Sequence, residues 1–180
     1  KLLASNPTLA IMLHGLIWQN PASKLGMTNR GESFSRLSLN PKALGDMIEI
    51  AEYRHGITTS LGLTPYPETP LELHAHYGNT EIQSAFGRDV FEGSVQSGPG
   101  VLLSKDKKSY ALLITLQKSE RDFSPSTMYR DYLVSRQILR WESQGATNQS
   151  SPTGQNLIHH LERGISIHLF VRKTKYLGNK

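Results

Sequence analysis

The stretch from Tyr110 to Gln144 holds the residues whose types could carry a function. It opens on the apolar run YALLITL, continues through a segment that mixes cations with aromatic rings, and ends on ILRWESQ. A purely structural strand would stay apolar, and a solvated face would not carry aromatic rings. We therefore interpret the stretch as a strand-borne surface that delivers aromatic, amide and cationic side chains together.

The aromatic side chains suggest a pocket for a flat ring. Stacking needs ring faces, and bonding the polar edge of a base needs a carboxylate, hydroxyl or amide nearby. The same rings would also suit a half-buried sheet, where aromatics are favoured for packing alone. The sequence favours neither the pocket nor the packing interpretation over the other. The candidate base-binding residues are Tyr129, Asp131, Tyr132, Trp141, Ser143 and Gln144, with Phe123 beside them.

Cations surround these aromatics and recur towards the end of the chain. Phosphate binding needs donors spread along a face, and Arg can donate to two phosphate oxygens at once. Small polar residues at a helix start can add backbone donors. For each residue alone, a solvated rim or an ordinary helix cap is the favoured explanation. The candidate phosphate-binding residues are Lys118, Arg121, Arg130, Arg136, Arg140, Thr153, Gln155, Arg172 and Lys173.

Catalytic and metal-binding patterns are missing from the sequence. His74 and His76 would share one face of a strand, but Glu72 is the only acid in phase with them. There is no Ser/His/Asp signature, Gly-rich phosphate loop or HExxH motif. The absence of cysteine excludes disulfides and thiolate metal sites. We therefore expect a binding domain without enzymatic activity, metal or cofactor of its own.

Composition and charge are those of one domain, or of one domain with a helical extension. The chain has 180 residues, 37% of them hydrophobic, and a net charge of +5. The basic excess suits an anionic partner, and no apolar run approaches the ~20 residues of a membrane span. The lack of cysteine suits a reducing cytoplasm. Because the chain opens at Lys1 without a signal-peptide pattern, we expect a cytoplasmic piece of a longer protein.

Local signals predict helices in the first third of the chain. Asn6 and Asn40 each precede a proline, which is a helix start with an Asn cap and Pro at the first helical position. Residues 20–39 are predicted as loop. We assign residues 1–56 to a helical N-terminal segment or a linker from an upstream domain. The second helix, ending near Gly56, is predicted to carry Leu44, Met47, Ile48 and Ala51 along one face.

The remainder, residues 57–180, is predicted as a sheet-based recognition domain. A short helix is expected from Asn79 through Phe86, and another from a Thr153 cap to Gly164. The second helix would turn Leu157, Ile158 and Leu161 inward. The expected fold class is α+β, with a curled, mainly antiparallel, barrel-like sheet and flanking helices. The predicted strands are residues 71–77, 101–104, 110–118, 129–135, 138–143 and 165–171.

Taken in order, several motifs resemble a known family. They are LELHAHYGNTEIQSAFG, GVLL, ALLITLQKSERDFSPSTMYRDYLVS, ILRWESQ, SPTGQ and IHLFVRK. The ordered set is similar to an uncharacterised domain of bacterial helicase-linked proteins. The chain departs from the family pattern at Arg140, where a His or another aromatic is expected, and at Glu142, where Gln is common. The residues that occupy the pattern are Lys118, Phe123, Tyr129, Asp131, Tyr132, Trp141, Ser143 and Gln144.

The resemblance implies that the chain is one domain of a larger multidomain protein. Such domains sit C-terminal to a superfamily-2 helicase, often with a phospholipase D-like nuclease further upstream. Some members are modification-dependent (type IV) restriction enzymes that cut DNA containing methylated cytosine. By analogy, the resemblance implies a curled sheet of the SRA/PUA type that receives an extruded base. ATP and a divalent metal would then serve the parent enzyme and not this domain.

Two functions are therefore expected from the sequence. The first is a target-recognition module that binds double-stranded DNA and reads a modified cytosine, 5-methylcytosine above all, by base flipping. Tyr132 and Trp141 would stack on the base, while Asp131 and Gln144 would bond its edge. The second is a protein–protein docking module for the upstream helicase and nuclease domains, with the aromatics buried in that contact and no base recognition.

Overall fold

The computed structural model describes residues 6–58, 62, 70–93, 100–121, 123–125, 128–145 and 147–175. The chain divides into two compact units. The helical unit comprises Lys1–Ala75 and Gln83–Val95, and the sheet unit comprises His76–Ile82 and Gln96–Lys180. The sequence-predicted division into residues 1–56 and 57–180 stays a prediction. Among the described residues, no helix has the length and apolar character that crossing a membrane requires.

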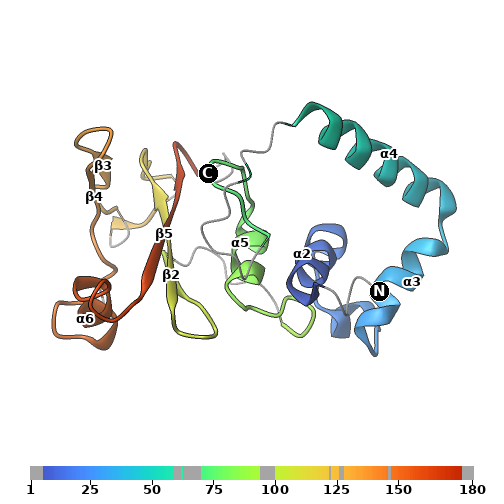
Figure 1. Cartoon of the computed structure of the whole chain (residues 1–180), viewed down its shortest axis with the longest axis horizontal. Helices are drawn as coiled ribbons and strands as arrows, with labels where there is room; N and C mark the ends of the chain where they lie inside the picture. The colour runs from blue at the N-terminus through green and yellow to red at the C-terminus, as the bar shows by residue number, and fades with distance from the viewer. Residues whose placement is uncertain are drawn as a thin grey trace. The chain divides into compact units, whose positions relative to one another are not determined.

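The helical unit begins with the helices labelled α2, α3 and α4 in Figure 1, which share one kind of start. An asparagine side chain, Asn6, Asn29 or Asn40, accepts a hydrogen bond from the backbone N–H three residues further on. The starts predicted at Asn6 and Asn40 are confirmed. Residues 20–39, predicted as loop, instead contain a 3-10 turn and a helix. The elements are α2 (Pro7–Trp18), η1 (Ala22–Leu25), α3 (Arg30–Ser38) and α4 (Pro41–Ile57).

A buried polar pair links α2 to α3. His14 and Ser33 are almost completely buried. The Nδ1 atom of His14 lies 2.8 Å from the Ser33 hydroxyl oxygen, and its Nε2 atom lies 3.0 Å from the carbonyl oxygen of Asn20. The imidazole ring is 5.0 Å from the ring of Phe91. Because both ring nitrogens have hydrogen-bond partners and both side chains are almost completely buried, we interpret the pair as structural and not as a nucleophile with its base.

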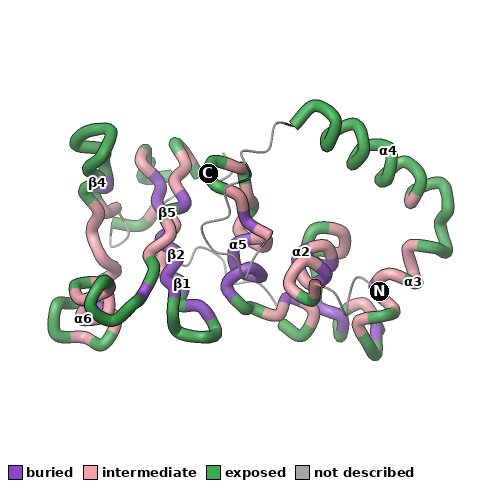
Figure 2. The backbone as a smooth tube through the Cα atoms, in the orientation of Figure 1, coloured by how far each residue is buried: buried purple, intermediate pink, exposed green. Residues whose placement is uncertain are grey.

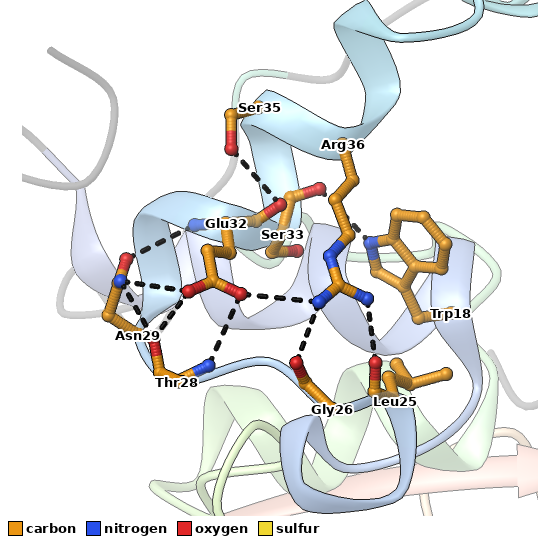
Figure 3. Close-up of polar contacts among 9 residues, drawn as sticks. All are labelled: Trp18, Leu25, Gly26, Thr28, Asn29, Glu32, Ser33, Ser35 and Arg36. Atoms are coloured by element: carbon orange, nitrogen blue, oxygen red, sulfur yellow. Dashed lines mark hydrogen bonds and ion pairs between the residues drawn. The ribbon is translucent and has the colours of Figure 1, made fainter.

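An arginine ties α3 to the turn that follows η1 (Figure 3). Arg36 donates hydrogen bonds to the carbonyl oxygens of Leu25 and Gly26 at 2.6 and 2.7 Å, and to Glu32 at 3.3 Å. Glu32 also accepts hydrogen bonds from the hydroxyl and the backbone N–H of Thr28. These two bonds, the hydroxyl first, hold the pKa of Glu32 below its ordinary value. Water reaches the network, since the Arg36 side chain is 36% exposed.

The helix α4 is exposed along most of its length (Figure 2). No residue of α4 is buried, and Ile48 and Tyr53 are 49% and 66% exposed. The predicted helix is confirmed, and its predicted apolar face of Leu44, Met47, Ile48 and Ala51 is not buried. Ile50 and Tyr53 stand on the other side of the helix, so no single face gathers the apolar residues.

A mixed three-stranded sheet is the centre of the sheet unit. The strand β1 (Val101–Leu103) pairs antiparallel with β2 (Ser109–Thr115), and β2 pairs in parallel with β5 (Ser166–Arg172). Six of the seven residues of β2 are buried. Figure 2 draws buried residues in purple along this strand. Burial on both faces is typical of a central strand with a parallel neighbour. The apolar core of this sheet consists of Leu102, Tyr110, Ala111, Leu112, Ile114, Ile165 and Phe170.

Short elements complete the described part of the sheet unit. A separate two-stranded antiparallel pair lies between β2 and β5 in the chain, and a helix follows it. The Nδ2 atom of Asn156 in this helix donates to the buried hydroxyl of Tyr110 at 3.1 Å, which links the helix to β2. The elements are β3 (Tyr132–Leu133), β4 (Leu139–Arg140) and α6 (Pro152–Ile158). The predicted short helix is α5 (Asn79–Ala85), and its first four residues belong to the sheet unit while its last three belong to the helical unit.

The predicted curled, mainly antiparallel barrel is wrong. Among the described residues, the two sheets have three and two strands, and neither closes into a barrel. The reason lies in β5, which joins β2 in parallel and therefore needs a crossover of the intervening residues 116–165. The mixed α+β composition holds, but the SRA/PUA-type sheet has no counterpart among the described strands.

Other predicted elements also differ. Residues 71–77 do not form a strand, because His74 has a φ of 66°, which an extended chain cannot contain. The strand face considered for His74 and His76 is therefore absent. Within the described ranges, no group of three or more His, Asp or Glu side chains could hold a metal ion. The strands predicted at 129–135 and 138–143 pair over only two residues each.

The helix α6 begins and ends earlier than predicted. Ser151, not Thr153, is the cap, and its hydroxyl accepts from the backbone N–H of Gly154 at 3.1 Å. The helix ends at Ile158 instead of at Gly164. Ile158 and Leu161, predicted to face inward, are 53% and 83% exposed. The apolar spacing therefore overstates the length and burial of this helix.

Candidate functional site

A buried ion pair anchors the segment that carries the predicted base-binding residues. We call residues 129–142, which include β3 and β4, the hairpin arm. Lys118, just after β2, donates from Nζ to Asp131 Oδ2 at 2.5 Å and to the carbonyl oxygen of Tyr129 at 2.7 Å. The side chains of Lys118 and Asp131 are only 8% and 5% exposed. The arm is thus fastened at its base to the end of the central strand.

Asp131 also joins the two sides of the arm. Its second carboxylate oxygen, Oδ1, accepts a hydrogen bond from the backbone N–H of Glu142 at 3.0 Å. Glu142 in turn accepts from the backbone N–H of Arg130 at 3.3 Å. Both oxygens of the buried Asp131 carboxylate are therefore engaged. Because its side chain is only 5% exposed, Asp131 presents little carboxylate surface to a base edge.

The outer face of the arm joins an aromatic ring to a cation. Tyr132 and Arg140 are direct partners across the β3–β4 pair. The guanidinium carbon of Arg140 lies 5.6 Å from the Tyr132 ring centroid, and Nη1 donates to the tyrosine hydroxyl at 3.4 Å. That hydrogen bond is the largest cause that raises the pKa of Arg140. Arg140 also contacts Glu142 at 3.3 Å, and Tyr132 is 45% exposed.

The other predicted base-binding residues lie close in the chain but make separate contacts. The Tyr129 hydroxyl accepts from the backbone N–H of Gly145 at 3.2 Å, and Lys118 lies 5.5 Å from its ring centroid. The Ser143 hydroxyl donates to the carbonyl oxygen of Thr147 at 2.7 Å. Gln144 lies against Gly100, and Trp141 is half-buried. A pocket formed jointly by these residues stays a prediction.

The predicted phosphate-binding residues divide between the arm and other places. Arg130, Arg136 and Arg140 are exposed on the arm, and Arg121 is exposed before it. On α6, Thr153 is half-buried and Gln155 donates to the carbonyl oxygen of Gln149 at 2.7 Å.

The last two predicted phosphate-binding residues lie where β5 ends. Arg172 donates to the Thr115 hydroxyl at 2.9 Å and to the carbonyl oxygen of Lys175 at 3.0 Å. Burial lowers the pKa of Arg172. Lys173 beside it is exposed. The Arg172 side chain therefore already donates hydrogen bonds within the sheet unit, whereas the Lys173 side chain is exposed to solvent.

The tip of the arm holds residues that the sequence analysis did not single out. Leu133, Val134 and Ile138 are 58%, 57% and 56% exposed. The sequence signal for this tip is that large aliphatic residues stand on both sides of the polar segment Ser135–Gln137. A polar turn of this kind interrupts a buried strand, so the aliphatic residues beside it lie at the end of a hairpin. The arm therefore presents aliphatic side chains in addition to Tyr132 and three arginines.

Comparison with known proteins gives one match. A family model described as a domain of unknown function, DUF3427, matches residues 71–180, which is more than half of the chain. The matched range includes α5, the mixed sheet, the hairpin arm and α6. No curated protein and no solved structure matches the chain.

Proposed function

The chain belongs to the DUF3427 family, and we propose that its sheet unit binds double-stranded DNA through the hairpin arm. The observation that carries this proposal is the exposed Tyr132–Arg140 pair, with Arg130 and Arg136 exposed on the same arm. Guanidinium groups donate to phosphate oxygens, and an exposed ring can stack on a base. The arginines and the tyrosine ring together match DNA, which offers both phosphates and bases.

The charge balance of the arm supports this choice of partner. The arm carries three arginines and two acids. Asp131 is withdrawn from solvent and neutralised by Lys118, and Glu142 is held at 3.3 Å from Arg140. The solvent-facing surface of the arm is therefore positive, which attracts a polyanion.

In the finer form of the proposal, the domain is the target-recognition module of a cytoplasmic, modification-dependent restriction enzyme. It reads a modified cytosine, 5-methylcytosine above all, after the base is extruded onto Tyr132 and Trp141. We assign the bonding of the base edge to Gln144 and Ser143. Asp131 and Lys118, whose polar atoms are engaged with each other, hold the arm. The domain performs no reaction itself, while ATP and a divalent metal serve the upstream helicase and nuclease domains.

Fluorescence anisotropy with matched methylated and unmethylated duplexes tests the proposal. Replacing Arg130, Arg136 or Arg140 with Gln should weaken binding to both duplexes and reduce the slope of log affinity against log salt by about 1 each. Lys105→Gln, at an exposed position in the β1–β2 turn, is the matched control. Trp141→Ala should cost about 1–3 kcal/mol of stacking, and more on methylated than on unmethylated DNA. Absence of binding to either duplex at low salt would contradict the proposal.

The second candidate function is protein docking, and the exposed aliphatic tip favours it. Leu133, Val134 and Ile138 present apolar surface that a helicase or nuclease domain of the same protein could cover. In that case the tip, and not the arginines, should control binding. A chain that fails to bind DNA but forms a complex with its upstream domains, lost on Leu133→Ser, would support docking.

A further inference from the structure

The tip of the hairpin arm combines exposure with internal order. The backbone N–H groups of Val134 and Ser135 both donate to the carbonyl oxygen of Ile138, at 2.8 and 3.2 Å. The Ser135 hydroxyl accepts from the backbone N–H groups of Gln137 and Ile138, both at 3.1 Å. The turn is thus closed by its own hydrogen bonds. It holds Leu133, Val134 and Ile138 out in solvent, where each stays more than half exposed.

Aliphatic side chains that an ordered turn holds in solvent can be buried only by a partner that offers an apolar space. Arg136 projects from the same turn and is exposed, and the arm's solvent-facing charge is positive. A partner of matching chemistry therefore has anionic groups that flank an apolar interior. Double-stranded DNA has this arrangement, because phosphates border a stack of bases that apolar side chains can enter. A two-stranded β-ribbon is also narrow enough to enter the major groove.

We propose that the arm tip, residues 133–138, is a wedge that inserts between neighbouring base pairs. Leu133, Val134 and Ile138 would fill the gap between the separated bases, while Arg136 contacts a flanking phosphate. This inference rests on the proposed DNA-binding function and adds to it how a base leaves the stack. By separating neighbouring bases, the wedge would lower the cost of taking one of them out of the stack.

A duplex that carries 2-aminopurine tests the wedge, because this base fluoresces weakly while stacked and strongly when unstacked. The whole 180-residue chain should raise the fluorescence on binding. Leu133→Ser and, separately, Val134→Ser should lose most of that rise. Both should leave the salt dependence of affinity unchanged, since neither removes a phosphate contact. Leu161→Ser, at a residue 83% exposed in the same unit, is the matched control and should behave as the unsubstituted chain.

The outcomes separate the wedge from the function on which it rests. Binding by anisotropy without any rise in 2-aminopurine fluorescence overturns the wedge and leaves DNA binding intact. No binding by anisotropy overturns both. Vesicles of phosphatidylserine and phosphatidylcholine serve as a competing anionic and apolar surface. If Leu133→Ser abolishes binding to vesicles and does not change the fluorescence with DNA, the tip is a membrane-inserting element and the wedge is overturned.

Discussion

The helical unit and the sheet unit each hold a cation against a carboxylate, but water reaches the two pairs to different extents. In the helical unit, Arg36 and Glu32 are 36% and 30% exposed and share their hydrogen bonds with backbone groups. In the sheet unit, Lys118 and Asp131 are 8% and 5% exposed. A solvated pair contributes little to stability, whereas a buried charge that loses its partner is strongly destabilising. An ion pair therefore contributes little to the stability of the helical unit, whereas the sheet unit depends on its ion pair to stay folded.

The largest effect is expected from Lys118→Met. This change leaves the Asp131 carboxylate buried without its counter-charge, which should cost about 3–5 kcal/mol of unfolding free energy. Each unit contains one tryptophan, Trp18 or Trp141, so the fluorescence of Trp141 in a Trp18→Phe background reports urea unfolding of the sheet unit. Adding Asp131→Asn should recover part of the loss, because the uncompensated charge is gone. A loss no greater than that of the exposed control Lys105→Met would contradict the comparison.

A smaller effect is expected from Arg36→Ala. It removes hydrogen bonds to Leu25 and Gly26 from a side chain that is one-third exposed, so we expect a loss of about 1 kcal/mol. Urea unfolding followed by Trp18 in a Trp141→Phe background measures it. Arg54→Ala, at an exposed position on α4, is the matched control. If Arg36→Ala were as damaging as Lys118→Met, exposure would not be what distinguishes the two networks.

The smallest effect is a difference in acid response. Burial lowers the pKa of His168 on β5 below its ordinary value of 6.5, so the unfolded state takes up the proton first. The sheet unit should therefore begin to lose stability as the pH falls below 6.5. For Glu32, the pKa is lowered from 4.5, and its contribution is present above that value and is lost below it.

Urea midpoints measured with each tryptophan from about pH 8 to about pH 3 would reveal the two windows. His168→Gln should remove the decline that starts at the higher pH, and Glu32→Gln should remove the one at the lower pH. Coincident declines in both units, unchanged by either substitution, would show that other groups govern the response to acid.

Local signals explain which helices could be predicted. Asn6 and Asn40 are each followed by proline, and the cap and the proline act within one turn of chain, so neighbouring residues suffice. The helix α3 begins at the equivalent cap Asn29 but is mainly polar, so no apolar period marks it. The parallel pairing of β2 with β5 joins residues more than fifty positions apart, and no local pattern encodes it.

In the candidate site, too, the residue types could be predicted from the sequence, whereas their contacts and burial could not. The sequence predicts Tyr132 as a base-binding residue and Arg140 as a phosphate-binding residue, and the short β3–β4 pair brings the two into direct contact. The engagement of Lys118 with Asp131 could not be predicted, because burial decides which of several cations meets the carboxylate. The aliphatic tip was passed over because exposure, and not residue type, makes Leu133 and Ile138 notable.

The crossover between β2 and β5 has a consequence for how the sheet unit can be divided. A proteolytic nick after Arg136 would leave β1, β2 and β3 on one fragment and β4, α6 and β5 on the other. The β2–β5 ladder from Ser109–Ser166 to Thr115–Arg172, the β3–β4 pair and the hydrogen bond from Glu142 to Asp131 all span the cut. The Lys118–Asp131 ion pair lies within the first fragment. The two fragments would remain associated, so the domain lends itself to complementation of separately produced halves.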